Sequence, residues 1–307
     1  MEQKRIVVVG SSNTDMVLKS NYLPAPGETV LGGTFSMNPG GKGANQAVAA
    51  ARLGGEVVLV ARVGNDQLGE QAIAGFKNHG IATDYISKDD EVASGVALIM
   101  VDKKGKNSIS VALGANGNLK MEYVQTALPA IVNSAFVLTQ LEIPVETVEY
   151  LGKIAEEHGL KLVLNPAPAQ VLSEELLASL YMITPNQLEA ELLSGIKVMD
   201  TATARAAALI FRTKGVGIVI ITMGSLGAYV LSDTLDELVP TQKVNVVDTT
   251  AAGDTFNGAL MVALAEGKSL KSAIEFANRA AAFSVGILGA QTSAPTREDI
   301  EPQLNVK

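Results

Sequence analysis

Residues 245–260 read NVVDTTAAGDTFNGAL. An apolar run at 244–247, predicted to be a strand, ends at Asp248, and a turn of small residues follows it. A helix is then expected to begin at Asp254. The free N–H groups and the positive dipole end of such a helix attract anions. A carboxylate at this place repels an anion, so Asp254 needs a role that explains it.

Two roles suit an Asp at this position. The side chain could cap the helix, which is a common use of Asp at a helix start. It could also act as a general base that accepts a proton from a substrate hydroxyl as the hydroxyl attacks a phosphoryl group. The preceding Ala251, Ala252 and Gly253 are small and leave backbone N–H groups accessible. An anion hole beside a base is what phosphoryl transfer needs.

Outside this stretch, short apolar runs alternate with helical patterns. Runs such as IVVV and GIVII are continuously apolar, which is typical of strands buried on both faces of a parallel sheet. The alternation predicts an α/β fold with a mostly parallel central sheet covered by helices. Strands are expected at 5–9, 57–63, 136–140, 161–165, 181–184 and 217–222. Helices are expected at 43–53, 67–79, 121–131, 145–158, 173–178, 187–194, 201–214, 254–266 and 269–286.

Two stretches, at about 14–39 and 92–112, break this alternation. They carry alternating or β-branched residues without helical periodicity, and KKGK at 103–106 is typical of a hairpin turn. Together they predict a small β-sheet that forms a lid over an active site. No change in composition marks a second domain, so residues 1–307 are expected to form one catalytic domain with this lid.

Composition restricts the partners and the chemistry. The net charge of −8 argues against a nucleic-acid partner. The absence of cysteine excludes a disulfide or a thiolate nucleophile and fits a cytoplasmic protein. The first apolar run has four residues, too few for a signal peptide, and no run approaches the roughly 18 apolar residues of a membrane span. We therefore expect a cytoplasmic protein that binds no membrane.

Polar and glycine-rich segments follow the expected strands, at the edge where open parallel sheets bind ligands. NPGGKGAN at 38–45 is not a P-loop, because Ser36 takes the place of the first glycine and Gly43 follows Lys42. Its glycines would let a ligand approach the backbone, and Lys42 and Asn45 would hydrogen-bond to it. The alternative is a glycine-rich turn that opens a helix.

Three more segments have a ligand-binding and a plain structural interpretation. Asn13 and Asp15 suit a vicinal diol, or else form an Asx turn. Asn186 and Glu189 share a helix face and could hold a Mg²⁺–phosphate group through water, or else cap that helix. The segment 222–227, TMGSLG, could pass under a nucleotide, or else be a turn.

NPGGKGANQAVAAARLG at 38–54 resembles the N-terminal signature of the ribokinase-like (PfkB) carbohydrate kinases, and VDTTAAGDTFNGAL at 247–260 resembles their C-terminal signature. NTD at 13–15, QLE at 140–142, NPAPA at 165–169, TPN at 184–186 and GAQTS at 289–293 match the ribose-phosphorylating members most closely. The resemblance covers essentially the whole chain. It implies a three-layer α/β/α sandwich with a β-sheet lid, and transfer of the ATP γ-phosphate to a sugar.

The resemblance also implies roles for individual residues. Asp254 matches the catalytic base, and Ala251, Ala252 and Gly253 match the anion hole. The sugar-contacting positions are Asn13, Asp15, Gly41, Lys42, Asn45 and Glu142, together with Asp254. The nucleotide-side positions are Asn186, Thr222, Gly224, Gly227, Gly253 and Asn278, to which the segments described above add Glu189 and Ser225. A potassium ion would be held by the loops that carry Asp248, Thr250, Ser284, Ile287, Gly289 and Ser293.

Two positions depart from the common family pattern. Ala251 stands where most members have Gly, although the ribose-phosphorylating members share this Ala. Leu226 stands where many relatives carry a polar or basic residue, so packing around the nucleotide would differ slightly. Neither change affects the chemistry that the resemblance implies.

The leading hypothesis is an ATP- and Mg²⁺-dependent kinase that converts D-ribose to ribose 5-phosphate. Other acceptors, such as 2-deoxyribose, fructose or a nucleoside, remain open, but a nucleoside needs an apolar or aromatic pocket and the lid offers only Tyr22 and Phe35. A non-catalytic sugar-binding regulator would be expected to lack the base or the anion hole. A dinucleotide oxidoreductase would need G-x-G-x-x-G where GSSNTD stands. A homodimer would protect the exposed lid edges and matches the family habit.

Overall fold

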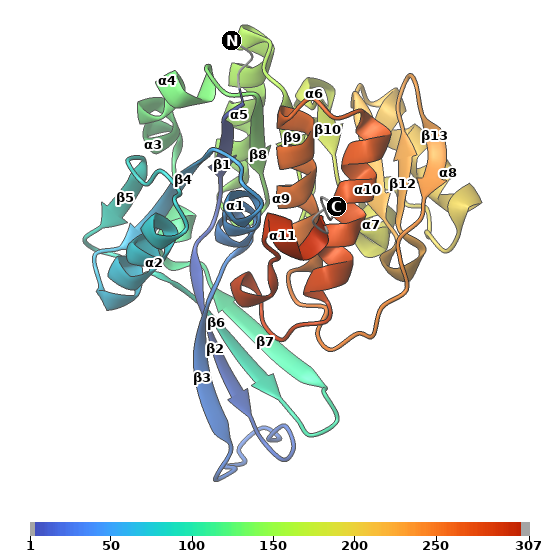
Figure 1. The fold of residues 1–307 in the computed structure, drawn as a ribbon. Helices are drawn as coiled ribbons and strands as arrows, with labels where there is room; N and C mark the ends of the chain where they lie inside the picture. Colours follow the sequence, from blue (N-terminus) through green and yellow to red (C-terminus); the bar gives the residue numbers. More distant parts are fainter. Residues whose placement is uncertain (1–3, 302–307) are drawn as a thin grey trace, which may run out of the picture.

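The computed structural model describes residues 4–301, and its central layer is a nine-stranded sheet (Figure 1). The strand order is β13-β12-β11-β10-β9-β8-β1-β4-β5. All neighbours from β11 to β5 pair in parallel, whereas β12 and β13 are antiparallel additions at one edge. The strands are β1 (Ile6–Val9), β4 (Val57–Gly64), β5 (Ile86–Asp89), β8 (Phe136–Thr139), β9 (Leu162–Leu164), β10 (Met182–Ile183), β11 (Ile218–Thr222), β12 (Ala228–Leu231) and β13 (Asp236–Val239).

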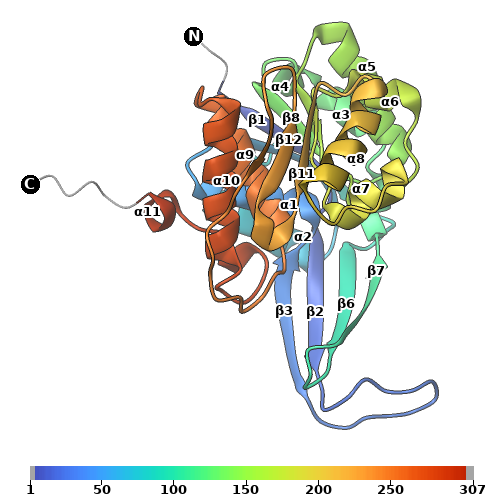
Figure 2. The same cartoon turned by 90° about the vertical axis from the view of Figure 1, so that its right-hand side faces the viewer.

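Helices cover both faces of this sheet, as Figure 2 shows. One face packs against α1 (Lys42–Arg52), α2 (Gln67–Asn78), α9 (Ala252–Ala265), α10 (Leu270–Ser284) and α11 (Arg297–Ile300). The other packs against α3 (Met121–Thr126), α4 (Leu128–Ile131), α5 (Val145–His158), α6 (Glu174–Ser179), α7 (Gln187–Ser194) and α8 (Thr201–Thr213). The predicted three-layer α/β/α sandwich is confirmed.

The alternation of side chains along a strand divides the core in two. In β1, Ile6 and Val8 belong to the core on the α1 and α9 side, while Val7 and Val9 belong to the core on the α5 side. All four are fully buried. Because successive side chains of a strand point to opposite faces, a strand between two helical layers must be apolar at every position. This is why the run IVVV predicts a central strand.

A second sheet of four strands projects from one end of the sandwich (Figure 1). It is built from the two stretches that break the strand–helix alternation, and its order is β3-β2-β6-β7. The middle strands β2 and β6 are parallel, and each outer strand pairs antiparallel with its neighbour. The strands are β2 (Asn13–Lys19), β3 (Thr34–Gly40), β6 (Gly95–Val101) and β7 (Asn107–Ala112). We call it the small sheet.

Three predictions about elements need correction. The run 244–247 is not a strand, and Val246 and Val247 are each 63% exposed. The chain leaves the sheet at Pro240, which has no N–H to donate, and the Val247 N–H instead donates to the Val285 carbonyl at 2.7 Å. The helix expected at 121–131 is two helices, because Pro129 lies in the first turn of the second. The edge strands β5 and β13, and β12 next to β13, were not predicted.

Three short 3-10 helices complete the described elements: η1 (Gly114–Asn118), η2 (Gly224–Leu226) and η3 (Gln291–Ser293). Among residues 4–301, no helix combines the length and the hydropathy that crossing a bilayer requires.

Candidate functional site

The first helix begins directly beside the start of the small sheet. Gly41 is the N-cap of α1 and has a φ of 86°, which favours glycine. A Cβ atom at this position would lie 2.6 Å from the Asn13 nitrogen, so the close approach also requires glycine. The two predicted sugar-contacting segments, around residue 13 and around residue 42, are therefore held against each other.

Asp254 lies at the start of α9 but does not cap it. The N-cap is Ala251, and Asp254 is the third helical residue, so the capping interpretation is wrong. Its carboxylate instead accepts hydrogen bonds from α1. The Asn45 Nδ2 donates to Oδ2 at 3.0 Å, and the Gln46 Nε2 donates to Oδ1 at 3.0 Å. The side chain thus points across the site, away from its own backbone.

Acidic and basic groups are concentrated around this carboxylate. Burial raises the pKa of Asp254, while Lys42 and the two amide hydrogen bonds oppose the rise. The pKa of Lys42 is raised in turn, chiefly by Asp254. Burial, with Glu142 and Asp254 nearby, raises the pKa of Asp15 to about 6. Three carboxylates and one ammonium group therefore share a partly dehydrated space, which is typical of catalytic sites.

The remaining predicted sugar-side residues lie in the same place. The Glu142 Oε2 accepts hydrogen bonds from the Ser11 hydroxyl at 2.6 Å and from the Lys42 N–H at 2.9 Å. The Asn13 Oδ1 accepts a hydrogen bond from the Asn116 Nδ2 at 2.8 Å. The structure therefore brings together Asn13, Asp15, Gly41, Lys42, Asn45, Glu142 and Asp254.

Open space lies above the start of α9. Gly253 is exposed, and a Cβ atom there would meet no atom within 4 Å. The first N–H groups of a helix have no partner within the helix, and of these the Ala252 N–H donates to the Thr249 carbonyl at 3.3 Å. Ala251 has a φ of 57° and is the one non-glycine residue between residues 4 and 301 with a positive φ. The turn of Ala251, Ala252 and Gly253 thus leaves open space at the helix start, directly before the buried Asp254 carboxylate.

The predicted nucleotide-side residues meet at the neighbouring strand ends. Asn186 and Thr222 form an isolated parallel bridge. A Cβ atom on Gly227 would lie 2.2 Å from the Val239 carbonyl oxygen, which also accepts a hydrogen bond from the Asn278 Nδ2 at 3.0 Å. Gly224 and Ser225 are exposed in η2, between these two contacts.

Asn186 and Glu189 form a reciprocal capping box at the start of α7. The Glu189 N–H donates to the Asn186 Oδ1, and the Asn186 N–H donates to the Glu189 Oε2, both at 2.9 Å. The structural interpretation of this pair is therefore confirmed. Burial raises the pKa of Glu189, and the Asn186 N–H and Lys42 oppose the rise. Lys42 thus lies near both the sugar-side and the nucleotide-side residues.

The six residues predicted to hold potassium come from two loops joined by Asp248. The Asp248 carboxylate accepts hydrogen bonds from the Thr250 hydroxyl at 2.6 Å and from the Gly289 N–H at 2.9 Å. Ser284 and Ser293 are fully buried, and both hydroxyls donate to nearby backbone carbonyls. Ile287, between them, is partly exposed and donates its N–H to the Ser284 carbonyl.

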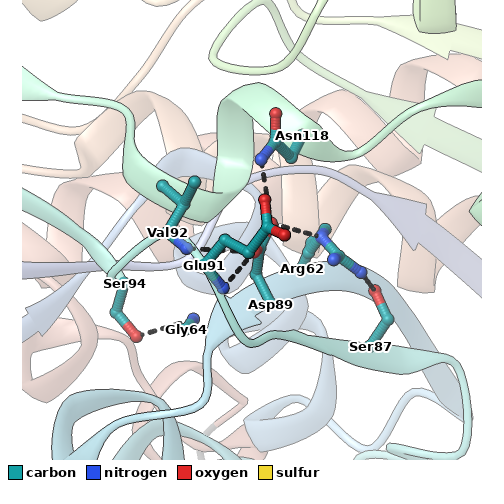
Figure 3. A network of polar contacts seen from close by, with 8 residues as sticks. All are labelled: Arg62, Gly64, Ser87, Asp89, Glu91, Val92, Ser94 and Asn118. Carbon is teal, nitrogen blue, oxygen red and sulfur yellow. Dashed lines mark hydrogen bonds and ion pairs between the residues drawn. The ribbon is translucent and has the colours of Figure 1, made fainter.

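A buried polar network holds the base of the small sheet (Figure 3). The Arg62 guanidinium pairs with Asp89 at 2.9 Å, and the Asn118 Nδ2 donates to the same carboxylate at 2.9 Å. The Asp89 carboxylate also accepts the N–H groups of residues 91 and 92. The Ser94 hydroxyl, one residue before β6, accepts the Gly64 N–H at 2.9 Å. The strand that enters the small sheet is therefore tied to the ends of β4 and β5.

Several contributors to the site were missed by reasoning from the sequence. They are Ser11, which holds Glu142, Asn116, which holds Asn13, and Gln46, which holds Asp254. Gln46 lies inside the N-terminal signature, directly after Asn45, and that position was the available signal. Asn116 is fully buried and lies in no recognised motif.

Comparison with known proteins shows which family the chain resembles. The model of the pfkB family carbohydrate kinases matches residues 3–297. A ribokinase of Haemophilus influenzae is 44% identical over 97% of this chain and 97% of its own length. A deoxyribokinase of Salmonella typhi is 36% identical over 98% and 99%. The structure of an Arabidopsis thaliana ribokinase complexed with ribose and ATP superimposes with a TM-score of 0.90, at 31% identity over 98% of both chains.

Proposed function

The chain belongs to the pfkB family of carbohydrate kinases, and on that premise we propose that it transfers the γ-phosphate of ATP to the 5-hydroxyl of D-ribose. The products are D-ribose 5-phosphate and ADP. The observation that carries this proposal is the buried Asp254 carboxylate, held by two amides beside Lys42 and next to the open start of α9. Similarity to ribokinases over nearly the whole chain supports D-ribose as the acceptor.

The sugar would lie between the start of α1 and the small sheet. The Asp15 carboxylate and the Asn13 amide suit two neighbouring hydroxyls, because a carboxylate accepts and an amide both accepts and donates. Glu142 and Asn45 supply further acceptors and donors, and Lys42 and Gly41 complete the contact. Asn13 and Glu142 are already held by neighbouring residues, so little side-chain ordering remains for sugar binding.

Asp254 acts as the general base of this reaction. It accepts the proton of the 5-hydroxyl while the hydroxyl oxygen forms a bond to the γ-phosphorus and the bond to the β-phosphate oxygen breaks. Its raised pKa makes it a stronger base than an exposed carboxylate. The backbone N–H groups of Ala251, Ala252 and Gly253 stabilise the charge on the transferring group.

The nucleotide would lie over the ends of β10, β11 and β12. Asn186, Thr222, Gly227 and Asn278 already meet there, and the exposed Gly224 and Ser225 border the same place. Gly253 would contact the terminal phosphates. Lys42, close to both Asp254 and Glu189, would add positive charge between the acceptor and the phosphates.

The site also fits the two expected metal ions. Among residues 4–301 there is no group of three or more His, Cys, Asp or Glu side chains that could hold a metal. This fits Mg²⁺ that is bound mainly by ATP phosphates and water, with Glu189 as an outer ligand. When bound, Mg²⁺ would neutralise phosphate charge.

The two loops joined by Asp248 offer only oxygen ligands. These are the Asp248 carboxylate, the Thr250, Ser284 and Ser293 hydroxyls, and backbone carbonyls that include those of Ile287 and Gly289. Such donors suit a hard monovalent cation such as potassium. When bound, potassium would add positive charge behind the anion hole, which follows Asp248 by only a few residues.

The small sheet would act as a lid and as a dimer interface. Asp15 and Asn13 lie on one face of it, and closure of that face over the sugar would exclude water. Phe35, Met37 and Leu98 are exposed, and their register places them on the opposite face. Burial of this apolar face against a second copy would also protect the edge strands β3 and β7. We further place this homodimeric kinase in the cytoplasm.

The test is a coupled assay of ADP release with ATP and Mg²⁺, over a panel of sugars and nucleosides, with and without potassium. The expected result is the highest kcat/KM for D-ribose and stimulation by potassium. Asp254→Asn is expected to lower kcat by at least about 100-fold. Preference for 2-deoxyribose, fructose or a nucleoside would be consistent with the proposed phosphoryl transfer but would show that D-ribose is not the preferred substrate. Absence of turnover with retained ribose binding would indicate a non-catalytic sensor.

A further inference from the structure

Gln46 has a position that the proposed chemistry does not yet use. It lies on α1 directly after Asn45, and its side chain is fully buried. Its Nε2 donates both of its hydrogens, to the Asp254 Oδ1 and to the Asn165 Oδ1, each at 3.0 Å. Its Oε1 accepts a hydrogen bond from the Gln140 Nε2 at 2.6 Å. Because all three positions are used, the amide has one orientation, and a donor always faces Asp254.

The network continues beyond Gln46 and returns to its start. The Asn165 Nδ2 donates to the Thr184 carbonyl at 2.9 Å, and the Thr184 hydroxyl donates to the Asn257 Oδ1 at 2.6 Å. The Asn257 Nδ2 then donates to the Gly253 carbonyl at 2.8 Å. All of these side chains are buried. The chain of contacts therefore links the Asp254 carboxylate to the backbone of the residue before it.

This hydrogen-bond network joins the Asp254 carboxylate to the Gly253 backbone, two groups that must act together in the proposed reaction. Asp254 is the proposed base, and Gly253 belongs to the proposed anion hole. A buried network of this kind is rigid, since moving one member breaks several hydrogen bonds in a place that water does not reach. The network thus holds the carboxylate and the N–H groups at a constant distance and angle.

We propose that Gln46 is a positioning residue for phosphoryl transfer, which fixes the Asp254 carboxylate and aligns it with the anion hole through Asn165, Thr184 and Asn257. The inference rests on the proposed function. With Oδ1 held by Gln46, Oδ2 is left on the side of Asn45, where the sugar hydroxyl would arrive. The amide also stabilises the ionised form of the base, which burial disfavours.

Loss of this donor has a predictable effect on the pH dependence of the reaction. The charged groups around Asp254 are Lys42 on α1, Asp15 on β2, Glu142 after β8 and Glu189 on α7. None of them is changed by a substitution at position 46. In Gln46→Met, which adds no charge, a shift of the acid limb of the pH–kcat profile therefore reports the lost donor, and the limb should move to higher pH.

The experiment compares the wild type with Gln46→Met and Gln46→Glu. Gln46→Met removes the donor and keeps the volume, whereas Gln46→Glu keeps the shape and puts an acceptor against the carboxylate. Gln46→Met should lower kcat by about 10- to 100-fold, the usual effect of one lost hydrogen bond to a charged group, and leave the KM of D-ribose and of ATP within about threefold. The acid limb of kcat should move to higher pH, further in Gln46→Glu.

Thr147→Val is the matched control. Thr147, on α5, is equally buried, and its hydroxyl donates to the Leu119 carbonyl at 2.7 Å, outside the network that holds Asp254. The Thr147→Val variant should have a lower Tm than the wild type, with an unmoved acid limb in its pH–kcat profile. If Gln46→Met does not fold, Gln140→Met tests the same path, because it frees the Gln46 Oε1 without touching Asp254, and a smaller shift of the limb in the same direction is expected.

The outcomes separate the two proposals. A wild type that does not phosphorylate D-ribose would overturn the proposed function, whatever the variants do. An active wild type together with folded Gln46 variants that keep kcat within twofold, or that behave like Thr147→Val with an unmoved acid limb, would overturn the positioning role alone.

Discussion

The carboxylate of Asp15 lies directly over the α-carbon of Gly40, in the space that any side chain at position 40 would need. A Cβ atom there would lie 2.4 Å from the Asp15 Oδ1. The two residues belong to paired strands, β2 and β3, so neither backbone can move without disturbing the small sheet. The absence of a side chain at Gly40 therefore sets the position of a proposed sugar ligand.

Gly40→Ala is expected to displace the Asp15 carboxylate and to weaken sugar binding selectively. The KM of D-ribose should rise by at least about tenfold, in line with the loss of hydrogen bonds to a charged group, while the KM of ATP stays within twofold. Steady-state kinetics with each substrate varied in turn would measure this. Gly75→Ala, in open space on α2, is the control and should change neither constant. An unchanged KM of D-ribose in Gly40→Ala would argue against Asp15 as a sugar ligand.

The raised pKa of Asp15 predicts opposite effects of pH on function and on stability. If ionised Asp15 binds the sugar, the KM of D-ribose should rise as the pH falls below about 6. The folded protein holds this proton more tightly than the unfolded chain, whose Asp pKa is near 3.8. The contribution of this group to stability is therefore greatest below pH 3.8 and is lost as the pH rises through about 6.

Asp15→Asn should consequently stabilise the protein at pH 7, by up to about 3 kcal/mol for the full shift, while it impairs sugar binding. The gain should shrink as the pH is lowered from 6 towards 4. Urea unfolding at several pH values would measure it, with the exposed Asp84→Asn as the control. A variant that is less stable than the wild type at pH 7 would contradict the prediction.

The positive φ of Ala251 predicts how this position tolerates substitution. Alanine in this region is strained by roughly 1–2 kcal/mol, and glycine removes the strain but adds about 0.4–1 kcal/mol of unfolded-state entropy. Ala251→Gly should therefore keep kcat and stabilise the protein slightly, by roughly 0–1.6 kcal/mol, with a small rise in Tm. Ala251→Val places a β-branched residue where it is rarely tolerated, and it should lower both kcat and Tm. Calorimetry and initial rates would test the pair, and equal behaviour of Gly and Val would refute the argument.

Asp248 predicts a specific effect on potassium activation. Burial raises the pKa of the Asp248 carboxyl, but hydrogen bonds from Thr250 and Gly289 outweigh burial and hold this pKa below its ordinary value. The carboxyl is therefore ionised at neutral pH. Asp248→Asn removes the charge and leaves one acceptor oxygen for three donors, the Thr250 N–H and hydroxyl and the Gly289 N–H. The potassium concentration for half-maximal activity should rise by at least about tenfold, by analogy with other lost charged contacts. Titration with potassium at constant ionic strength, balanced with choline, would measure this, and an unchanged midpoint would remove Asp248 from the cation site.

The lowered pKa of Asp89, at the base of the small sheet, predicts that this residue stabilises the fold less at acid pH. Hydrogen bonds from Asn118, Arg62 and the following backbone hold its pKa well below 3.8. Its contribution is therefore complete above pH 3.8 and is lost as the pH falls below that value. Asp89→Asn should be less stable than the wild type at pH 7, and the difference should narrow as the pH falls towards 3. The exposed neighbour Asp90→Asn is the control in urea unfolding, and a constant difference at all pH values would contradict this account.

The fold class could be predicted because burial on both faces leaves a continuous apolar run, as in Ile6–Val9. The edge strands β5 and β13 could not, since both are short and partly polar. Strand β12 carries the same apolar signal as β1 and was missed. The run 244–247 was misleading for a related reason. It is largely apolar, but the chain has already left the sheet at Pro240, and apolarity alone does not distinguish a buried strand from an exposed extended segment.

The candidate site was partly predictable. Motifs identified the residues around Asp254, but the choice between a cap and a base depends on where its side chain points. That direction is set by hydrogen bonds from Asn45 and Gln46, which lie 209 and 208 residues earlier in the chain. The same holds for Gln46, whose partners Asn165 and Asp254 are distant in the chain. Local patterns report local geometry, whereas the network behind the base exists only once the sheet has brought its strand ends together.

The two flanks of the central sheet are encoded by two successive segments of the chain. Strands β1 to β7, up to residue 112, build one flank of the central sheet and all of the small sheet, and strands β8 to β13 build the other flank. Most proposed sugar ligands come from the first 45 residues, and most nucleotide-side residues come from the second flank. A single recombination event between related genes, in the segment between β7 and β8, could therefore give a kinase a new acceptor while it inherits the phosphate-donor half unchanged.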